Sequence, residues 1–263
     1  MIILPGMRGI AGRRPAAGGG AFTGGSYIFN GSNERLQRTF STSSPELRIM
    51  TASLWAAVET YDNLGGPDFF VLNGCTSAGD DSGWAIVDQL GGPGGDPGLS
   101  YFDEREFVID AALASLPTVS AWNHYVLRID TTQGASANRV RQYKNGTLLT
   151  QDDSSAFSND EVNWFVNGAV HYWGADANPS YADGKLAFID MVYGASHAPT
   201  DFAFDDGGTW TAKTFVGSYG TYGYRLDGTD GFNDVSGNGL NFTGSNMTIG
   251  ANIDTGDLPP YSF

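Results

Sequence analysis

The 263-residue sequence contains a single cysteine, Cys75, so no disulfide can form within the chain and we expect a free thiol. Charged residues make up only 16% of the sequence, and 14 Lys and Arg stand against 29 Asp and Glu, a net charge of −15. This charge excludes nucleic acid as a partner of the whole chain, because phosphate binding needs clustered Lys and Arg. No apolar run approaches the roughly 18 residues that span a bilayer. Residues 1–6 also lack the basic-then-apolar order of a signal peptide.

Apolar residues are nevertheless plentiful and evenly spread. They make up 41% of the chain, and 16 Phe, 12 Tyr and 6 Trp are among them. This content excludes a wholly disordered chain, which would need low hydrophobicity as well as high charge. A chain of this length often forms one β-sandwich or barrel, so we expect one large domain with appendages.

The basic residues are concentrated near the start. Residues 1–50 carry six Arg and two Glu, a net of +4, whereas residues 51–263 carry 8 basic and 27 acidic residues, a net of −19. Residues 1–25 are rich in Gly and lack an apolar period, so they cannot bury enough surface to fold alone. We expect an extended arm there that docks on a partner subunit through Arg8, Arg13 and Arg14. A disordered tail, common at termini, is the alternative.

The body of the chain is predicted to be made of strands. Short runs of β-branched and aromatic residues are separated by Gly, Asp, Asn and Ser, and no 12-residue segment has a helical apolar stripe. Asn145-Gly146 is the clearest hairpin signal, and single helical turns are expected only at 110–115 and 199–204. Many short strands favour an antiparallel sandwich. The predicted strands are 26–30, 36–40, 47–58, 68–72, 84–90, 107–111, 125–129, 140–149 (with the turn), 162–166, 169–173 and 186–193.

Three motifs in a fixed order carry a family resemblance. They are W-N-H-Y at 122–125, Y-K-N-G at 143–146 and D-G-K-L-A-F-I-D-M-V-Y at 183–193. This order resembles the concanavalin A-like (laminin G-like) jelly-roll domains over about residues 26–204. The resemblance implies an all-β, antiparallel jelly-roll sandwich, with residues 205–263 as a Gly/Asp/Asn-rich C-terminal wrap.

The wrap adds a second resemblance. Y-G-Y-R-L-D at 222–227, D-V-S-G-N-G-L-N-F-T at 234–243 and an Asp/Pro-rich stretch at 254–260 are similar to sequences in tailed-bacteriophage virion proteins. The resemblance implies a non-enzymatic virion protein, assembled in the host cytoplasm: a tail-fibre or receptor-binding component that contacts host surface glycan. The alternative is a capsid decoration protein that stabilises the shell. Either role fits contacts with other virion proteins through the arm and a homo-oligomer, with a trimer favoured.

Catalysis finds little support in the sequence. Glucanases of this fold need acids that alternate on one strand face, and Glu104 and Glu106 share a face with no acid between them. His124, His171 and His197 lack the close spacing of a zinc motif, and we expect His124 and His171 to be packed in the core or at its rim. No Gly-x-Ser-x-Gly motif is present. A carbohydrate-active enzyme and a free lectin are therefore the less favoured function classes.

Two groups of residues remain as binding candidates. Calcium is the one candidate cofactor, with ligands from Asp227, Asp230 and Asp234 on a Gly-rich loop and next from Asp152 and Asp153; ordinary Asx turns are the alternative for the loop. Aromatic side chains stack on sugar rings, so Tyr219, Tyr222 and Tyr224 are candidate glycan or subunit contacts. Trp164 and Trp173 are instead expected to fill the core.

Overall fold

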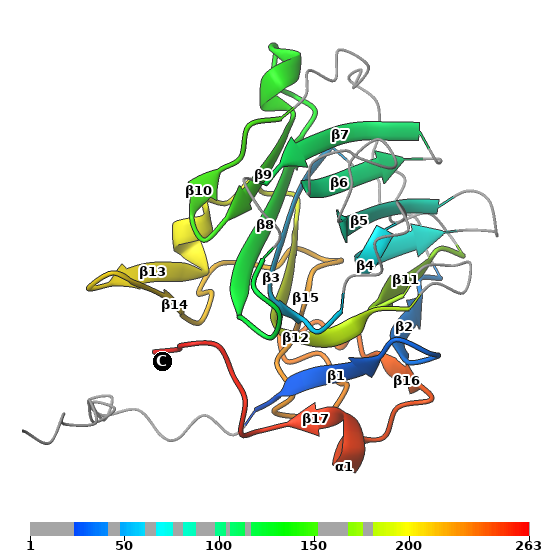
Figure 1. Cartoon of the computed structure of the whole chain (residues 1–263). Coiled ribbons are helices and arrows are strands. Elements are labelled where there is room, and N and C mark those ends of the chain that lie inside the picture. The colour runs from blue at the N-terminus through cyan, green and yellow to red at the C-terminus, as the bar shows by residue number, and fades with distance from the viewer. Residues whose placement is uncertain are drawn as a thin grey trace, which may run out of the picture.

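The computed structural model describes residues 24–41, 48–60, 67–75, 81–87, 98–103, 106–113, 117–151, 168–175 and 181–262 (Figure 1). Two large antiparallel sheets and a separate two-stranded hairpin account for the strands within these ranges. Several predictions lie outside them: the arm with Arg8, Arg13 and Arg14, the strand 162–166 with Trp164, and the acids Asp152, Asp153 and Glu104.

The first sheet carries the longest strands. β12 is at its centre, paired with β3 on one side and β1 on the other, and β15 joins β12 further along. In sheet order the strands are β10 (Thr147–Leu148), β9 (Val140–Lys144), β8 (Asn123–Asp130), β3 (Ile49–Val58), β12 (Asp183–Tyr193), β1 (Ser26–Asn30) and β17 (Ile253–Asp254), with β15 (Tyr224–Leu226) off this path.

The second sheet has seven strands and forms the other layer. In sheet order they are β16 (Thr243–Ser245), β2 (Arg35–Thr39), β11 (Val170–Trp173), β4 (Pro67–Cys75), β5 (Asp81–Val87), β6 (Gly98–Asp103) and β7 (Glu106–Ala112). The predicted all-β antiparallel sandwich is confirmed. Two local predictions are wrong: 110–112 end β7 rather than starting a helical turn, and β6 was not predicted. The turn expected near 199 is present as the 3-10 helix η3 (Pro199–Asp201).

Aromatic residues dominate the core between the sheets. Trp173 is fully buried, as predicted, and so are Trp84 and Tyr125. The Trp84 indole donates a hydrogen bond of 2.8 Å to the buried side chain of Gln142. Burying several large rings in this way supplies much of the apolar stabilisation of the sandwich.

The outer face of the first sheet is covered too. A bulge in β12 puts Ala187 and Phe188 on this face together, with Phe188 in a left-handed conformation at φ 46°. The hairpin β13 (Ala203–Asp206) and β14 (Thr209–Ala212) and the C-terminal segment lie over them, and Figure 1 shows the hairpin beside the first sheet. The members of this outer cluster are Trp55, Ala187, Phe188, Ala203 and Ala212, with Trp122, Trp210, Leu258 and Tyr261 packed against it.

Residues 205–262 contribute to both layers. Their strands β15 and β17 pair with β12 and β1 in the first sheet, and β16 pairs with β2 in the second. The helices within the described ranges are short: α1 spans Ile249–Asn252, and η1 spans Ser136–Asn138. No helix in the described part of the chain is long and apolar enough to cross a membrane.

Candidate functional site

In the predicted calcium loop, Asp234 accepts hydrogen bonds from backbone N–H groups of the protein. Asp234 Oδ1 accepts from the backbone N–H of Arg225 and of Ser236, and Oδ2 accepts from the backbone N–H of Leu240. The bond from Ser236, two residues further on, is that of an Asx turn, and the bonds from Arg225 and Leu240 tie the loop to β15 and to its own end.

The three acids of this loop do not converge. Asp227 accepts from Thr229 N–H and from Arg225 Nε, and Asp230 is exposed. Among the described residues no group of three or more His, Cys, Asp or Glu is placed to hold a metal ion. Asp227 and Asp234 thus make the bonds expected of the turn alternative, and calcium binding by this loop stays a prediction.

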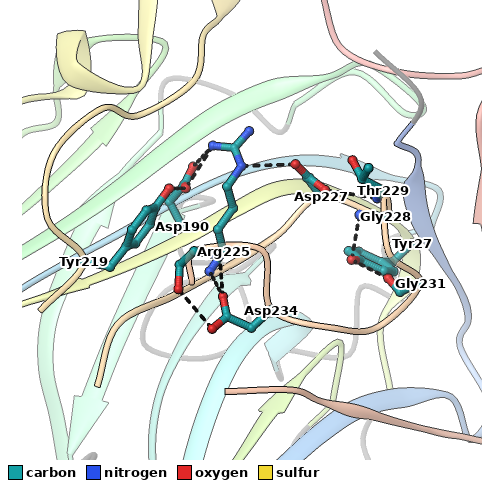
Figure 2. A network of polar contacts seen from close by, with 10 residues as sticks. Tyr27, Asp190, Tyr219, Arg225, Asp227, Gly228, Thr229, Gly231 and Asp234 are labelled. Carbon is teal, nitrogen blue, oxygen red and sulfur yellow. Dashed lines mark hydrogen bonds and ion pairs between the residues drawn. The ribbon is translucent and has the colours of Figure 1, made fainter. Parts of the chain in front are cut away.

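Arg225 joins this loop to the first sheet through a buried ion pair (Figure 2). Its Nη1 donates to both carboxylate oxygens of Asp190, at 3.1 and 3.3 Å, and its Nε donates to Asp227 Oδ2 at 3.2 Å. The Tyr219 hydroxyl donates to Asp190 Oδ1 at 2.6 Å. Burial raises the pKa of Asp190, although Arg225 and Tyr219 act in the opposite direction. This network holds the fold together and presents no group to solvent.

The three candidate tyrosines are largely internal. Tyr224 has 0% of its surface exposed, and its hydroxyl accepts a hydrogen bond from Trp173 Nε1 at 3.1 Å, so the prediction that it contacts a glycan or a subunit is wrong. Tyr219 is 9% exposed and its hydroxyl is held by Asp190. Tyr222 is half-buried and packs edge-on against Tyr193. Local sequence could not reveal this, because β15 turns Tyr224 toward the core.

Ser53 and His124 form a buried pair of the residue types that hydrolases use. Ser53 Oγ lies 2.8 Å from His124 Nε2, and Trp210 Nε1 donates to His124 Nδ1 at 2.9 Å. An indole nitrogen is only a donor, so Nδ1 must be the unprotonated nitrogen and Nε2 carries the proton. His124 therefore donates to Ser53 and cannot remove its proton, and burial lowers the pKa of His124 to about 3. The pair is structural; the predicted burial of both His124 and His171 is confirmed.

An open polar pocket lies where β8 and β9 reach the loop between them. It has a volume of about 100 Å³ and is lined almost wholly by polar groups. Its residues, which we call the rim pocket, are Arg128 and Asp130 from β8, Gln133 and Asn138 from the connecting loop, Arg141 from β9, and Ser196 from the segment after β12. Sequence reasoning did not single out any of the six.

Hydrogen bonds fix one guanidinium of the rim pocket. Arg128 donates from Nε and Nη2 to Ser196 Oγ, at 3.0 and 2.7 Å, and from Nη1 to the Tyr143 hydroxyl at 3.0 Å. Arg141 donates from Nη2 to Asn138 Oδ1. Among the described residues the other guanidinium N–H groups of these two arginines have no acceptor, so an oxygen-bearing ligand could accept hydrogen bonds from them.

The one acid of the rim pocket is committed to its own loop. Asp130 Oδ1 accepts from Thr132 N–H at 3.1 Å, and Oδ2 accepts from Gln133 Nε2 at 2.6 Å. Burial alone would raise the pKa of Asp130, but these bonds and the charge of Arg128 outweigh it, so the pKa lies below its ordinary value. The rim pocket thus holds two guanidinium groups and one ionised carboxylate at neutral pH.

Comparisons with known proteins bear on the fold. No protein-family model matches the sequence, and no curated protein matches it. A solved protein from Bacteroides ovatus, to which carbohydrate binding is ascribed, has a TM-score of 0.54 at 16% identity, over 89% of this chain and 62% of that chain. The full extracellular region of zebrafish Gpr126/Adgrg6 has a TM-score of 0.50 at 13% identity, over 90% and 27%.

A third match is the heptameric SAP-like pentraxin from Limulus polyphemus, with a TM-score of 0.48 at 13% identity over 66% of this chain and 77% of that chain. The chain spans less than two thirds of the length of the Bacteroides ovatus protein and of the Gpr126/Adgrg6 extracellular region. Likeness at this level of identity shows the fold alone. Together with the two antiparallel sheets it confirms the predicted concanavalin A-like jelly-roll sandwich.

Proposed function

We propose that this chain is a non-enzymatic, lectin-like sandwich that binds a glycan at the rim pocket. We further propose that it serves in a tailed-phage virion as a tail-fibre or receptor-binding component. The observation that carries the binding proposal is the rim pocket itself: an open site lined by guanidinium, amide and hydroxyl groups. Sugars are recognised through such donors and acceptors, because their hydroxyls need partners of both kinds. The carbohydrate binding ascribed to the matched Bacteroides ovatus protein supports the same proposal.

Binding is favoured over catalysis by the chemistry of the acid present. A glycoside hydrolase needs two carboxyl groups that flank the scissile bond, one of them an acid with a raised pKa. The rim pocket contains one carboxylate, Asp130, and its pKa is lowered rather than raised. The Ser53–His124 pair offers no nucleophile either, because the imidazole is the donor.

The virion role rests on the sequence resemblance of the wrap and on the charge of residues 1–25. An arm that carries Arg8, Arg13 and Arg14 would dock on acidic or carbonyl groups of a neighbouring capsid or tail subunit, and the sandwich would then face outward. Gly25, the last residue of the predicted arm, donates its N–H to Asp227 O at 3.0 Å, which fixes the point where the sandwich begins.

Glycan binding is tested with the full chain on an array of bacterial surface glycans, followed by titration of each bound glycan. We expect binding in the millimolar-to-micromolar range, which corresponds to about 4 to 8 kcal/mol. Arg128→Ala should abolish it, whereas the matched variant Arg35→Ala, on the second sheet, should not. If no glycan binds, the binding proposal is wrong; if only Arg35→Ala abolishes binding, the site lies elsewhere.

The virion role is tested by electron microscopy of intact particles labelled with an antibody against the sandwich. Label at the tail tip or fibres supports the adhesin role, and label over the head supports the decoration alternative instead. Deleting residues 1–24 should leave the sandwich folded and stop its incorporation into particles. Particles without label would refute the virion role, and particles that carry the truncated chain would refute anchoring by the arm.

A further inference from the structure

Two arginines of the rim pocket face each other across neighbouring strands. Arg128 in β8 and Arg141 in β9 are direct partners in the antiparallel register. Side chains in such positions have Cβ atoms about 4.5 to 5.5 Å apart, and like charges placed there destabilise a sheet. The fold therefore maintains a repulsive pair at the mouth of an open pocket.

Asp130 lies in the same pocket and interacts with the charge of Arg128 without forming a direct ion pair with it. Across the described residues no carboxylate lies within ion-pairing distance of Arg128 or Arg141, and the groups they bond to, Ser196, Tyr143 and Asn138, are all uncharged. Arg225 has the opposite arrangement: its guanidinium is enclosed by Asp190 and Asp227. Among the described residues, Arg225 thus has two carboxylates in direct contact, whereas this opposed pair of arginines has none.

The basic character extends beyond the two side chains. Residues 128–144 contain Arg128, Arg139, Arg141 and Lys144 against a single acid, Asp130, a net of +3, whereas residues 51–263 as a whole carry −19. Arg139 donates to the backbone carbonyls of Gln133 and Gly134 and so holds the loop of the rim pocket in place. The local potential at the rim pocket is therefore positive on an acidic protein, which attracts anionic ligand groups to this point.

We propose that the rim pocket binds an anionic substituent of its glycan, a carboxylate, sulfate or phosphate group, between the guanidinium groups of Arg128 and Arg141. This inference rests on the proposed glycan-binding function and names the class of sugar. Guanidinium groups match the planar or tetrahedral oxygens of such anions with paired N–H donors. Ser196 and Tyr143 hold Arg128 ready for this contact, which lowers the ordering cost of binding.

The dimensions agree with one small charged group. A cavity of about 100 Å³ has room for a few water molecules or one carboxylate or sulfate, and the rest of the sugar would lie over its open mouth. Asp130 does not compete for the guanidinium groups by direct contact, since its oxygens are held by Thr132 and Gln133. It does leave the pocket with a net charge near +1, which suits a single negative charge.

The test compares matched ligands on the full-length chain by calorimetry. The probes are a uronic-acid oligosaccharide, the same oligosaccharide with its carboxyl groups reduced to alcohols, and a sulfated oligosaccharide of equal length. We expect the carboxylated or the sulfated probe to bind at least about tenfold more tightly than the reduced one. Binding should weaken as salt rises from 0.05 to about 0.5 M, because the guanidinium groups are open to solvent.

Variants then locate the effect. Arg141→Gln should remove the preference for the charged probe, whereas Lys213→Gln removes one positive charge outside the rim pocket and should keep it. Without ligand, Arg141→Gln should unfold at the same or a higher urea concentration than wild type, because a repulsive neighbour has been removed. That result also shows that the variant is folded.

The outcomes separate this inference from the proposed function. Equal binding of charged and neutral probes, unaltered by Arg141→Gln, would overturn the anionic-group proposal and leave glycan binding intact. A charge preference that Lys213→Gln removes and Arg141→Gln does not would also overturn it, since the attraction would then come from elsewhere. Absence of binding to every probe and to the wider glycan array would overturn both.

Discussion

The buried ion pair between Arg225 and Asp190 makes a quantitative prediction for Asp190→Asn. Asn has nearly the same shape as Asp but no charge, so Asp227 would be the remaining carboxylate partner of Arg225 among the described residues. Removing one member of a buried ion pair costs about 3 to 5 kcal/mol. The low end applies here because Asp227 still balances the guanidinium, so we expect a loss of about 3 kcal/mol in the free energy of unfolding.

The assay is urea unfolding of wild type and Asp190→Asn, with Asp206→Asn as the matched control. Asp206 undergoes the same chemical change at an exposed position and should stay within about 0.5 kcal/mol of wild type. Arg225→Gln should cost a similar amount to Asp190→Asn, and the double variant should lose less than the sum, by about 1 to 3 kcal/mol. If Asp190→Asn matches the control, Arg225 does not depend on this carboxylate and the account of the network is wrong.

Three further predictions concern other parts of the sandwich. Burial lowers the pKa of His124 to about 3, below its unfolded value of 6.5. The free energy of unfolding should therefore fall by up to about 1.4 kcal/mol per pH unit as the pH drops below 6.5. His124→Gln should flatten that slope in urea titrations at pH 4 to 8. Gly146→Ala should lower the free energy of unfolding by at least about 1 to 2 kcal/mol in the same assay, because Gly146 has φ 79° and a Cβ would lie 2.6 Å from the Trp210 ring. The control Gly134→Ala should cost little, because a Cβ there meets no atom within 4 Å. Trp210→Phe should cost about 1 to 3 kcal/mol by leaving His124 Nδ1 without its donor, and an unchanged urea midpoint would refute the assigned tautomer.

The parts of the fold that follow from local chemistry were predictable from the sequence. Asn145 and Gly146 adopt φ values of 47° and 79°, the left-handed conformations that this pair favours, and the hairpin β9–β10 forms around them. The strand β1 has the predicted bounds of 26–30, because its apolar run ends at a turn signal. In both cases the deciding residues lie within a few positions of each other.

Strands defined by distant partners were not predictable in the same way. β15, β16 and β17 have only two or three residues each and pair with β12, β2 and β1, far away along the chain. β6 follows a Gly- and Pro-rich run and is held by β5 and β7 on both sides. Their conformation comes from the sheets they join, which local propensity does not contain.

The motif residues behind the family resemblance turn out to interlock. His124 N–H donates to Asn145 Oδ1 at 2.8 Å, and Asn145 Nδ2 donates to Asn123 Oδ1 at 3.0 Å, which ties the hairpin turn to the start of β8. Trp122 Nε1 donates to Asp257 Oδ1 at 2.9 Å and thereby attaches the C-terminal segment. These contacts explain why the motifs indicate the fold and carry no information about a ligand.

The local positive charge of the rim pocket is present in the sequence, but it disappears when the net charge is summed over a long segment. Over residues 51–263 the net charge is −19, and that total conceals the four basic residues between 128 and 144. Composition also cannot show that Arg128 and Arg141 are opposite each other, because the register depends on how the intervening loop closes. The sequence instead favoured the acids of residues 227–234 as a binding site, whereas in the structure Asp234 accepts hydrogen bonds from backbone N–H groups.

The opposed arginines differ from two other cations of the described chain, Lys185 and Arg225, which have carboxylate partners. Lys185 pairs with Asp254 and Asp257, and Arg225 with Asp190 and Asp227, whereas Arg38 and Arg139 donate to backbone carbonyls. An acidic residue in place of Ser196 or Asn138 would have given Arg128 or Arg141 a carboxylate partner. Two like charges placed opposite each other on neighbouring strands are unfavourable, and departures from local rules of this kind are expected mainly at functional sites. The net positive charge that remains at the rim pocket therefore agrees with the proposed ligand, which brings its own negative charge.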